Sequence, residues 1–99
     1  MKVTYHPAVQ RDINEAIAYY RSISETLADE FWEELMHEIE YTQRNPKASH
    51  FADCGLRRKN LARFPYHFLY ENLEGKIRIL VVRHHKRSPS FGLKRRWRR

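Results

Sequence analysis

The residues best suited to chemistry form a cationic and titratable run at the end of an apolar segment. The apolar segment Ile77–Val82 is followed directly by Arg83, His84, His85, Lys86 and Arg87. Arginine and lysine bind anions, and histidine can also transfer a proton because its unperturbed pKa of about 6.5 lies near neutral pH. A buried strand that ends in such residues is a rigid mount for a functional site. Further groups of the same kind occur earlier in the chain, at Arg57, Arg58, Lys59 and His67.

The spacing of the histidines limits what they can do together. His84 and His85 are adjacent, so on a strand they point to opposite faces and cannot act as a pair on one substrate or hold one metal ion. We therefore predict no metal site and no cofactor. His67 and His84 remain candidates for acid–base work, although each can equally be a surface or packing residue.

Other titratable residues carry weaker signals. The glutamates between Glu30 and Glu38 fall on one side of a helical pattern, and a solvated helix face explains them better than a carboxylate or metal site. Cys54 is the single cysteine, which excludes an internal disulfide and a cysteine-rich zinc site.

Charge is divided unevenly along the chain. Residues 1–45 hold nine Asp and Glu against four Lys and Arg, whereas residues 46–99 hold fifteen Lys and Arg against three Asp and Glu. A solubilising surface would mix the two signs. The segregation favours an acidic partner for the second half, either nucleic acid or an acidic protein.

Hydrophobic patterning predicts the elements that position these residues. Residues 2–5 form a strand, Val9–Tyr20 and Ser24–Asn45 form two helices with Ser24 as an N-cap, and Leu56–Leu61 forms a strand or edge segment. Tyr66–Tyr70 and Ile77–Val82 form a hairpin that turns at Glu74-Gly75. Ile77, Ile79 and Val81 lie on one face of the last strand, with Leu80 and Val82 on the other.

The predicted fold is α+β, in the order β-α-α-β-β-β. A small, mostly antiparallel four-stranded sheet carries an N-terminal helical hairpin on one face and leaves the other face free to bind. The whole chain, 1–99, is expected to be one domain, because its length and 41% apolar content support one core. We expect a cytoplasmic protein, since the sequence has neither a membrane-spanning apolar run nor a signal-peptide core.

The C-terminal segment, residues 88–99, is predicted to be irregular and basic. Its last six residues, Lys94–Arg99, could bind phosphate through the cations and stack a base on Trp97. They could equally be a solvated tail or a patch for an acidic partner protein.

In order and spacing, these residues resemble the RelE/ParE superfamily, the toxins of bacterial type II toxin–antitoxin modules. The matching pieces are Pro7-Ala8, Asp12-Ile13, Tyr19-Tyr20, Asn45-Pro46, Gly55–Arg58, Phe64–Tyr70, Ile79–Val82 and His84–Pro89. The resemblance implies a toxin held inactive in a hetero-oligomer by a cognate antitoxin whose disordered segment wraps its surface.

Two activities are known in the superfamily. RelE-like members are metal-independent ribonucleases that cut mRNA on the ribosome, and ParE-like members poison DNA gyrase without hydrolysis. The motifs RRxxLxxFPYxxxY and HxKRxP resemble the ParE or plasmid-stabilisation branch more than the RelE branch. We therefore expect a gyrase inhibitor. A RelE-like ribonuclease is the alternative, and a degenerate toxin that only binds its antitoxin and regulates their operon is a third possibility.

The resemblance also suggests which residues carry each activity. Arg87 matches an arginine at the strand end, and His67 stands where a RelE-like enzyme has an arginine. The C-terminal tyrosine of those ribonucleases is missing, with Phe91 nearest to it. If the protein is a ribonuclease, its catalytic residues would be His67, His84 and Arg87. The residues expected to bind the target or the antitoxin are Arg57, Arg58, Lys59, Arg83, Lys86, Arg87 and Trp97.

Overall fold

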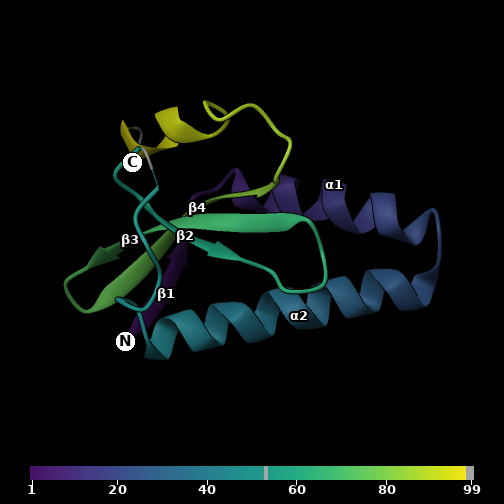
Figure 1. The fold of residues 1–99 in the computed structure, drawn as a ribbon, viewed down its shortest axis with the longest axis horizontal. Helices are drawn as coiled ribbons and strands as arrows, with labels where there is room; N and C mark the ends of the chain where they lie inside the picture. The colour runs from purple at the N-terminus through teal and green to yellow at the C-terminus, as the bar shows by residue number, and fades with distance from the viewer. Residues whose placement is uncertain (53, 98–99) are drawn as a thin grey trace.

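The computed structural model describes residues 1–52 and 54–97, with the backbone alone at Trp97. It contains four strands, two α-helices and a short 3-10 helix (Figure 1). In chain order these are β1 (Lys2–Tyr5), α1 (Val9–Arg21), α2 (Glu25–Arg44), β2 (Arg57–Asn60), β3 (Tyr66–Leu73), β4 (Lys76–His84) and η1 (Leu93–Trp97). The predicted α+β fold and its element order are confirmed.

The strands form one sheet in the order β1-β4-β3-β2. β2 pairs with β3 and β3 pairs with β4 in antiparallel fashion, whereas β1 runs parallel to β4. The hairpin between β3 and β4 turns at Gly75, whose φ of 75° lies in the region that glycine adopts without strain. β4 is thus a central strand, as its apolar residues of both parities predicted.

Local signals set the ends of the helices. Ser24 caps α2, because its hydroxyl oxygen accepts a hydrogen bond from the backbone N–H of Leu27 at 3.1 Å. α2 ends at Arg44, one residue before the pair Asn45-Pro46, where proline disfavours helical geometry in the preceding residue. Both predictions for the second helix are confirmed.

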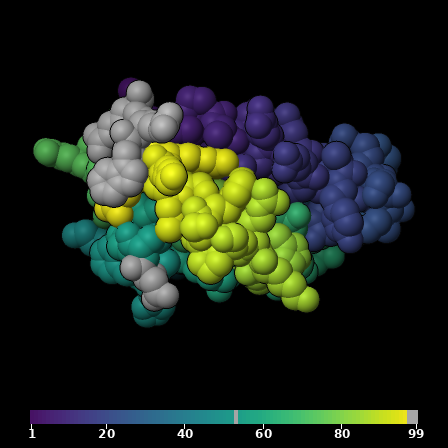
Figure 2. Space-filling view, turned by 90° about the horizontal axis from the view of Figure 1, so that it is seen from above, coloured from purple at the N-terminus to yellow at the C-terminus, as the bar shows by residue number. Residues whose placement is uncertain are grey.

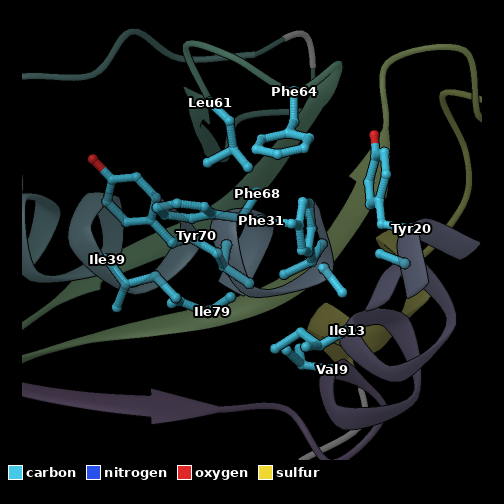
Figure 3. Close-up of a cluster of buried hydrophobic side chains, with 14 of the residues drawn as sticks. Val9, Ile13, Tyr20, Phe31, Ile39, Leu61, Phe64, Phe68, Tyr70 and Ile79 are labelled. Carbon is cyan, nitrogen blue, oxygen red and sulfur yellow. The ribbon is translucent and has the colours of Figure 1, made fainter. Parts of the chain in front are cut away.

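Both helices pack on one face of the sheet, which we call the helix face. Aromatic rings from helices, strands and the connecting loop meet there (Figure 3). Phe31 of α2 is fully buried, and its ring centroid lies 5.3 Å from that of Phe64 and 5.1 Å from that of Tyr66. These edge-to-face contacts supply the main core of the domain.

A β-bulge changes which residues of β4 face the helices. Tyr70 pairs with Ile79 and Leu69 pairs with Val81, so Leu80 is the extra residue. Ile77, Ile79 and Val82 consequently belong to the core on the helix face, whereas Leu80 and Val81 lie on the opposite face. The prediction that Val81 shares a face with Ile77 and Ile79 is wrong. The extra residue of the bulge shifts the alternation of side chains between the two faces by one position.

The opposite face of the sheet, which we call the far face, is covered rather than free. Leu56, Leu69, Leu80 and Val81 form a second buried cluster there, with Phe91 and Leu93 packed against it. The covering segment, residues 88–97, is the C-terminal strap that crosses the sheet on the side away from α2 (Figures 1 and 2). The strap includes η1, so the prediction of an irregular segment is corrected there, and Arg98 and Arg99 lie outside the described residues.

Within the described part of the chain, no helix combines the length and the apolar character needed to cross a membrane.

Candidate functional site

Strand alternation gathers four polar side chains on the far face, beside the strap. Arg58 of β2, His67 of β3 and Arg83 of β4 lie there, and His85 follows directly after β4. Together with Arg87 they line a groove of about 590 Å³. Ala52, Cys54, Pro89, Ser90 and Leu93 complete its wall, so we define the groove by these ten residues.

A chain of hydrogen bonds runs through the groove and fixes the histidine tautomers. Arg83 donates from Nε to Nε2 of His67 at 2.9 Å, so the proton of the His67 ring must sit on Nδ1. That nitrogen lies 2.9 Å from Nδ1 of His85 and donates to it. The Nη2 atom of Arg58 lies 3.3 Å from the same His85 nitrogen and also donates to it. Both imidazoles are therefore neutral and stacked, with an interplanar angle of 16°.

Burial and neighbouring cations keep these imidazoles neutral. His67 is 1% exposed, and burial, followed by the charges of Arg58 and Arg83, lowers its pKa to about 3. Burial, Arg58 and His84 also lower the pKa of His85. Neither ring thus accepts a proton readily near neutral pH.

Arg83 joins the groove to the strap. It is 8% exposed, and its Nη1 atom donates to the carbonyl oxygens of Pro89 at 2.9 Å and Phe91 at 2.8 Å. Burial lowers the pKa of Arg83 from its usual value, although guanidinium remains charged at any physiological pH. Arg83 thus acts as a structural tie as well as a groove residue.

A second tie holds the strap near the bulge. Arg95 binds Asp12 of α1 through two hydrogen bonds, at 2.6 and 3.0 Å, and also donates to the carbonyl oxygen of Leu80 at 3.0 Å. Asp12 accepts a further hydrogen bond from the backbone N–H of Val82. The pair therefore satisfies backbone groups of β4 beyond the end of β1, where no neighbouring strand can do so.

The structure separates the three predicted cations of β2. Arg58 faces the groove, but Arg57 donates to the carbonyl oxygen of Ser49 at 2.7 Å and lies 4.2 Å from the centre of the Phe51 ring. Lys59 forms an ion pair with Glu38 of α2 at 3.6 Å. Adjacent strand residues point to opposite faces, so one run of basic sequence does not make one basic patch.

The candidate catalytic residues are separated as well. His67 is in the groove, whereas His84 packs edge-on against Tyr66, with 5.1 Å between ring centroids. Arg87 lies between them, because it lines both the groove and a small cavity of about 90 Å³ beside His84. A mechanism that shares a substrate between His67 and His84 would need them on one face. Both ring nitrogens of His67 are also already engaged.

Lys86, another predicted binding residue, lies away from these contacts. Lys86 is exposed, lines neither the groove nor the small cavity, and donates its backbone N–H to Nδ1 of His84 at 3.0 Å. The side chain of Trp97 lies outside the described residues, so its predicted role stays a prediction.

Sequence reasoning missed the part that His85 plays. The prediction that His84 and His85 point to opposite faces is confirmed, since they line different cavities. The partner of His85, which is His67, can be recognised only from the register of β3 against β4. Arg95 and Asp12, 83 positions apart, carried no sequence signal of their contact.

The arrangement is suited to binding rather than to proton transfer. Cations and neutral imidazole donors surround the groove, and its described lining holds no carboxylate. No group of three His, Cys, Asp or Glu residues in the described part of the chain could hold a metal ion. The groove residues can therefore donate hydrogen bonds to a ligand and attract negative charge.

Comparison with known proteins bears on the fold. The sequence matches no protein-family model and no curated protein. It is similar to a chain in the solved structure described as "Chromosomal ParDE TA system from P. aeruginosa", with 17% sequence identity and a TM-score of 0.75. The match covers 85% of this chain and 95% of that chain. At this identity the likeness concerns the fold, and it confirms the resemblance seen in the sequence: this protein has a ParE/RelE-like fold.

Proposed function

We propose that this protein is the toxin of a type II toxin–antitoxin module, neutralised by a cognate antitoxin and acting on DNA gyrase by binding. The observation that carries the proposal is the fold likeness to a chain of a ParDE system over 85% of the sequence. A cytoplasmic location follows from such a role. The ParE-type sequence motifs and the chemistry of the groove support gyrase as the target.

The groove supports a binding toxin better than a ribonuclease. Cleavage of RNA through its 2′-OH needs a base, an acid and cations for the phosphorane charge. Arg58, Arg83 and Arg87 would serve as the cations, but His67 has a pKa of about 3 and no free ring nitrogen. A RelE-like ribonuclease would therefore need residues other than His67 as its acid and base.

The charge distribution supports an antitoxin that brings acids to the groove. Such a segment would fold as it binds and would place carboxylates near Arg58 and Arg87 and apolar anchors on exposed hydrophobic side chains. Calorimetry should then show a large negative heat-capacity change and an affinity that falls as salt rises. If the affinity did not change between low and high salt, the antitoxin would not bind through the cations of the groove.

Two purified assays test the activity. In the first, gyrase and supercoiled plasmid are incubated with the protein, and cleaved DNA is measured. In the second, ribosomes translating a defined mRNA are used, and cut mRNA is mapped. We expect gyrase-dependent DNA cleavage and intact mRNA. The reverse result would replace gyrase poisoning with the ribonuclease, and inactivity in both assays beside tight antitoxin binding would favour the degenerate toxin.

Variants add a control to both assays. Arg87→Gln removes an exposed groove cation, and Arg21→Gln removes an exposed cation that is paired with Glu25 on the helical hairpin. Both changes lower the net charge by one. We expect the gyrase effect to weaken in Arg87→Gln and to persist in Arg21→Gln. Equal weakening in the two variants would indicate that only the overall charge matters.

A further inference from the structure

The strap is held to the rest of the protein by side chains rather than by backbone pairing. Its own backbone hydrogen bonds stay within it: the N–H groups of Phe91, Leu93 and Arg95 each donate to the carbonyl oxygen three residues earlier, at 2.9, 3.2 and 3.1 Å. Among the described residues, no backbone hydrogen bond joins residues 88–97 to another element. The strap can therefore leave the far face without breaking the hydrogen-bond ladders of the sheet.

Three arginines tie the strap down near its two ends. Near its start, Arg83 of β4 donates to two carbonyl oxygens of the strap. Near its end, Arg95 binds Asp12 of α1. There Arg96 also donates from Nη1 to the carbonyl oxygen of Cys54, in the loop before β2, at 2.9 Å. The ties reach three different parts of the protein, so the strap is pinned at both ends rather than at one point.

The middle of the strap rests on a small apolar contact. Phe91 and Leu93 pack on the buried cluster of the far face, but both side chains stay partly exposed. Between them, Gly92 lies so close to Val81 that an added Cβ atom would come within 2.7 Å of the Val81 side chain. The strap is therefore seated closely but buries few apolar groups of its own, which is typical of segments that open locally.

The groove depends on the strap for its shape. Pro89, Ser90 and Leu93 of the strap form one wall of it. Arg83 is held between strap carbonyl oxygens on one side and Nε2 of His67 on the other. If the strap left the far face, the groove would lose this wall, and Nη1 of Arg83 would lose both of its acceptors. The groove is thus a property of the protein with the strap in place.

We propose that the strap is a lid that opens and closes as one unit over the far face, while the core on the helix face stays folded. The pair Asp12–Arg95 is its latch, because it joins the end of the strap to α1 and to the carbonyl oxygen of Leu80. The groove exists in the closed state, so a ligand that binds there stabilises closure, and a change that opens the lid weakens binding. The inference goes beyond the proposed function and does not depend on what the groove binds.

The test is amide hydrogen exchange of the full chain, followed residue by residue by NMR. The amides of Phe91, Leu93 and Arg95 report on the strap, and those of α2 and β3 report on the core. We expect the strap amides to exchange faster than the core amides, yet more slowly than in an unstructured peptide. Equal protection of strap and core would show that the strap leaves only when the whole protein unfolds. Exchange as fast as in an unstructured peptide would show that the strap is not closed in solution. Either result would overturn the lid.

Three variants separate opening of the strap from global unfolding. Arg95→Gln breaks the latch and should speed exchange of the strap amides by about tenfold or more, whereas Lys94→Gln, at an exposed neighbour, should not. Ile39→Val weakens the core on the helix face and should speed the core amides by about threefold to tenfold while the strap amides stay as they are. If Ile39→Val sped strap and core equally, the strap would not open separately. If Arg95→Gln behaved like Lys94→Gln, the pair Asp12–Arg95 would not be the latch.

Two further signals connect the strap to the groove. The Nε–H of Arg83 donates to His67 in the closed state, and Cys54, the single cysteine of the chain, is partly buried in the groove wall. In Arg95→Gln, exchange of this N–H and reaction of the thiol with a labelling reagent should both rise along with exchange of the strap amides. Lys94→Gln should change neither signal. Faster strap exchange with both signals unchanged would show that the groove does not need the closed lid, which would overturn that part of the proposal.

Discussion

On the helix face of the sheet, aromatic rings are packed against one another, and on the far face a short apolar cluster gives way to arginines and histidines. The first face buries Phe31, Phe64 and Phe68 in the core between the helices and the sheet. Among the described residues, the second has four buried apolar side chains beneath the strap and a polar network beside it. The difference indicates that the helix face supplies most of the stability, while the far face holds donors in place for binding.

The largest effect should come from the helix face. Phe31→Ala removes a ring that is 0% exposed and contacts Tyr20, Phe64 and Tyr66. We expect a loss of about 3–5 kcal/mol in the free energy of unfolding, which is much of the stability of a small domain. Urea unfolding followed by circular dichroism measures it. A loss below about 1 kcal/mol would show that this cluster is not the main core.

The next effect concerns the strap. Arg95→Gln leaves the Asp12 carboxylate, 3% exposed, without its charged partner, and we expect a loss of about 3 kcal/mol. Lys94→Gln changes an exposed neighbour in the same helix and should alter stability by less than about 0.5 kcal/mol. Thermal melts of both variants compare them. Similar melting temperatures would mean that the Asp12–Arg95 pair contributes nothing in solution.

The third effect is a dependence on pH from the far face. The pKa of His67 is about 3 in the folded protein and about 6.5 in an unfolded chain. Between these values the unfolded state binds the extra proton. The stability from His67 is therefore complete above about pH 6.5 and is lost as pH falls toward 3, at roughly 1.4 kcal/mol per pH unit. His67→Gln should flatten this dependence between pH 6.5 and 4.5 in urea unfolding. If the free energy of unfolding depended on pH equally in His67→Gln and in the unmodified protein, the low pKa assigned to His67 would be contradicted.

The smallest effect separates the two stacked histidines. His85 is exposed, and Gln can replace its hydrogen bonds, so His85→Gln should cost roughly 0.5–1 kcal/mol in the free energy of unfolding. The same urea experiment at pH 7 measures this change. A loss as large as that of Phe31→Ala would mean that the groove network, rather than the aromatic core, holds the fold together.

The sequence by itself determined the elements of this protein and the class of its fold. Local signals suffice for that: the periodicities of the two helices, the cap at Ser24, the stop before Pro46 and the turn at Gly75 act within a few residues. The charge division along the chain is likewise a property of the sequence alone. The prediction that the basic run stands at the end of the buried strand β4 is confirmed, because strand and run are continuous in the sequence.

Only the tertiary structure decided what those residues do together. The bulge at Leu80 reversed the facing of Val81 and Val82, and every residue after it depends on that shift. The neutrality of His67 comes from its burial between Arg83 and His85, and the strap is held by Arg95 through a partner 83 positions away. Such contacts depend on strand register and burial, which are set by the sum of all packing in the domain and not by any local stretch.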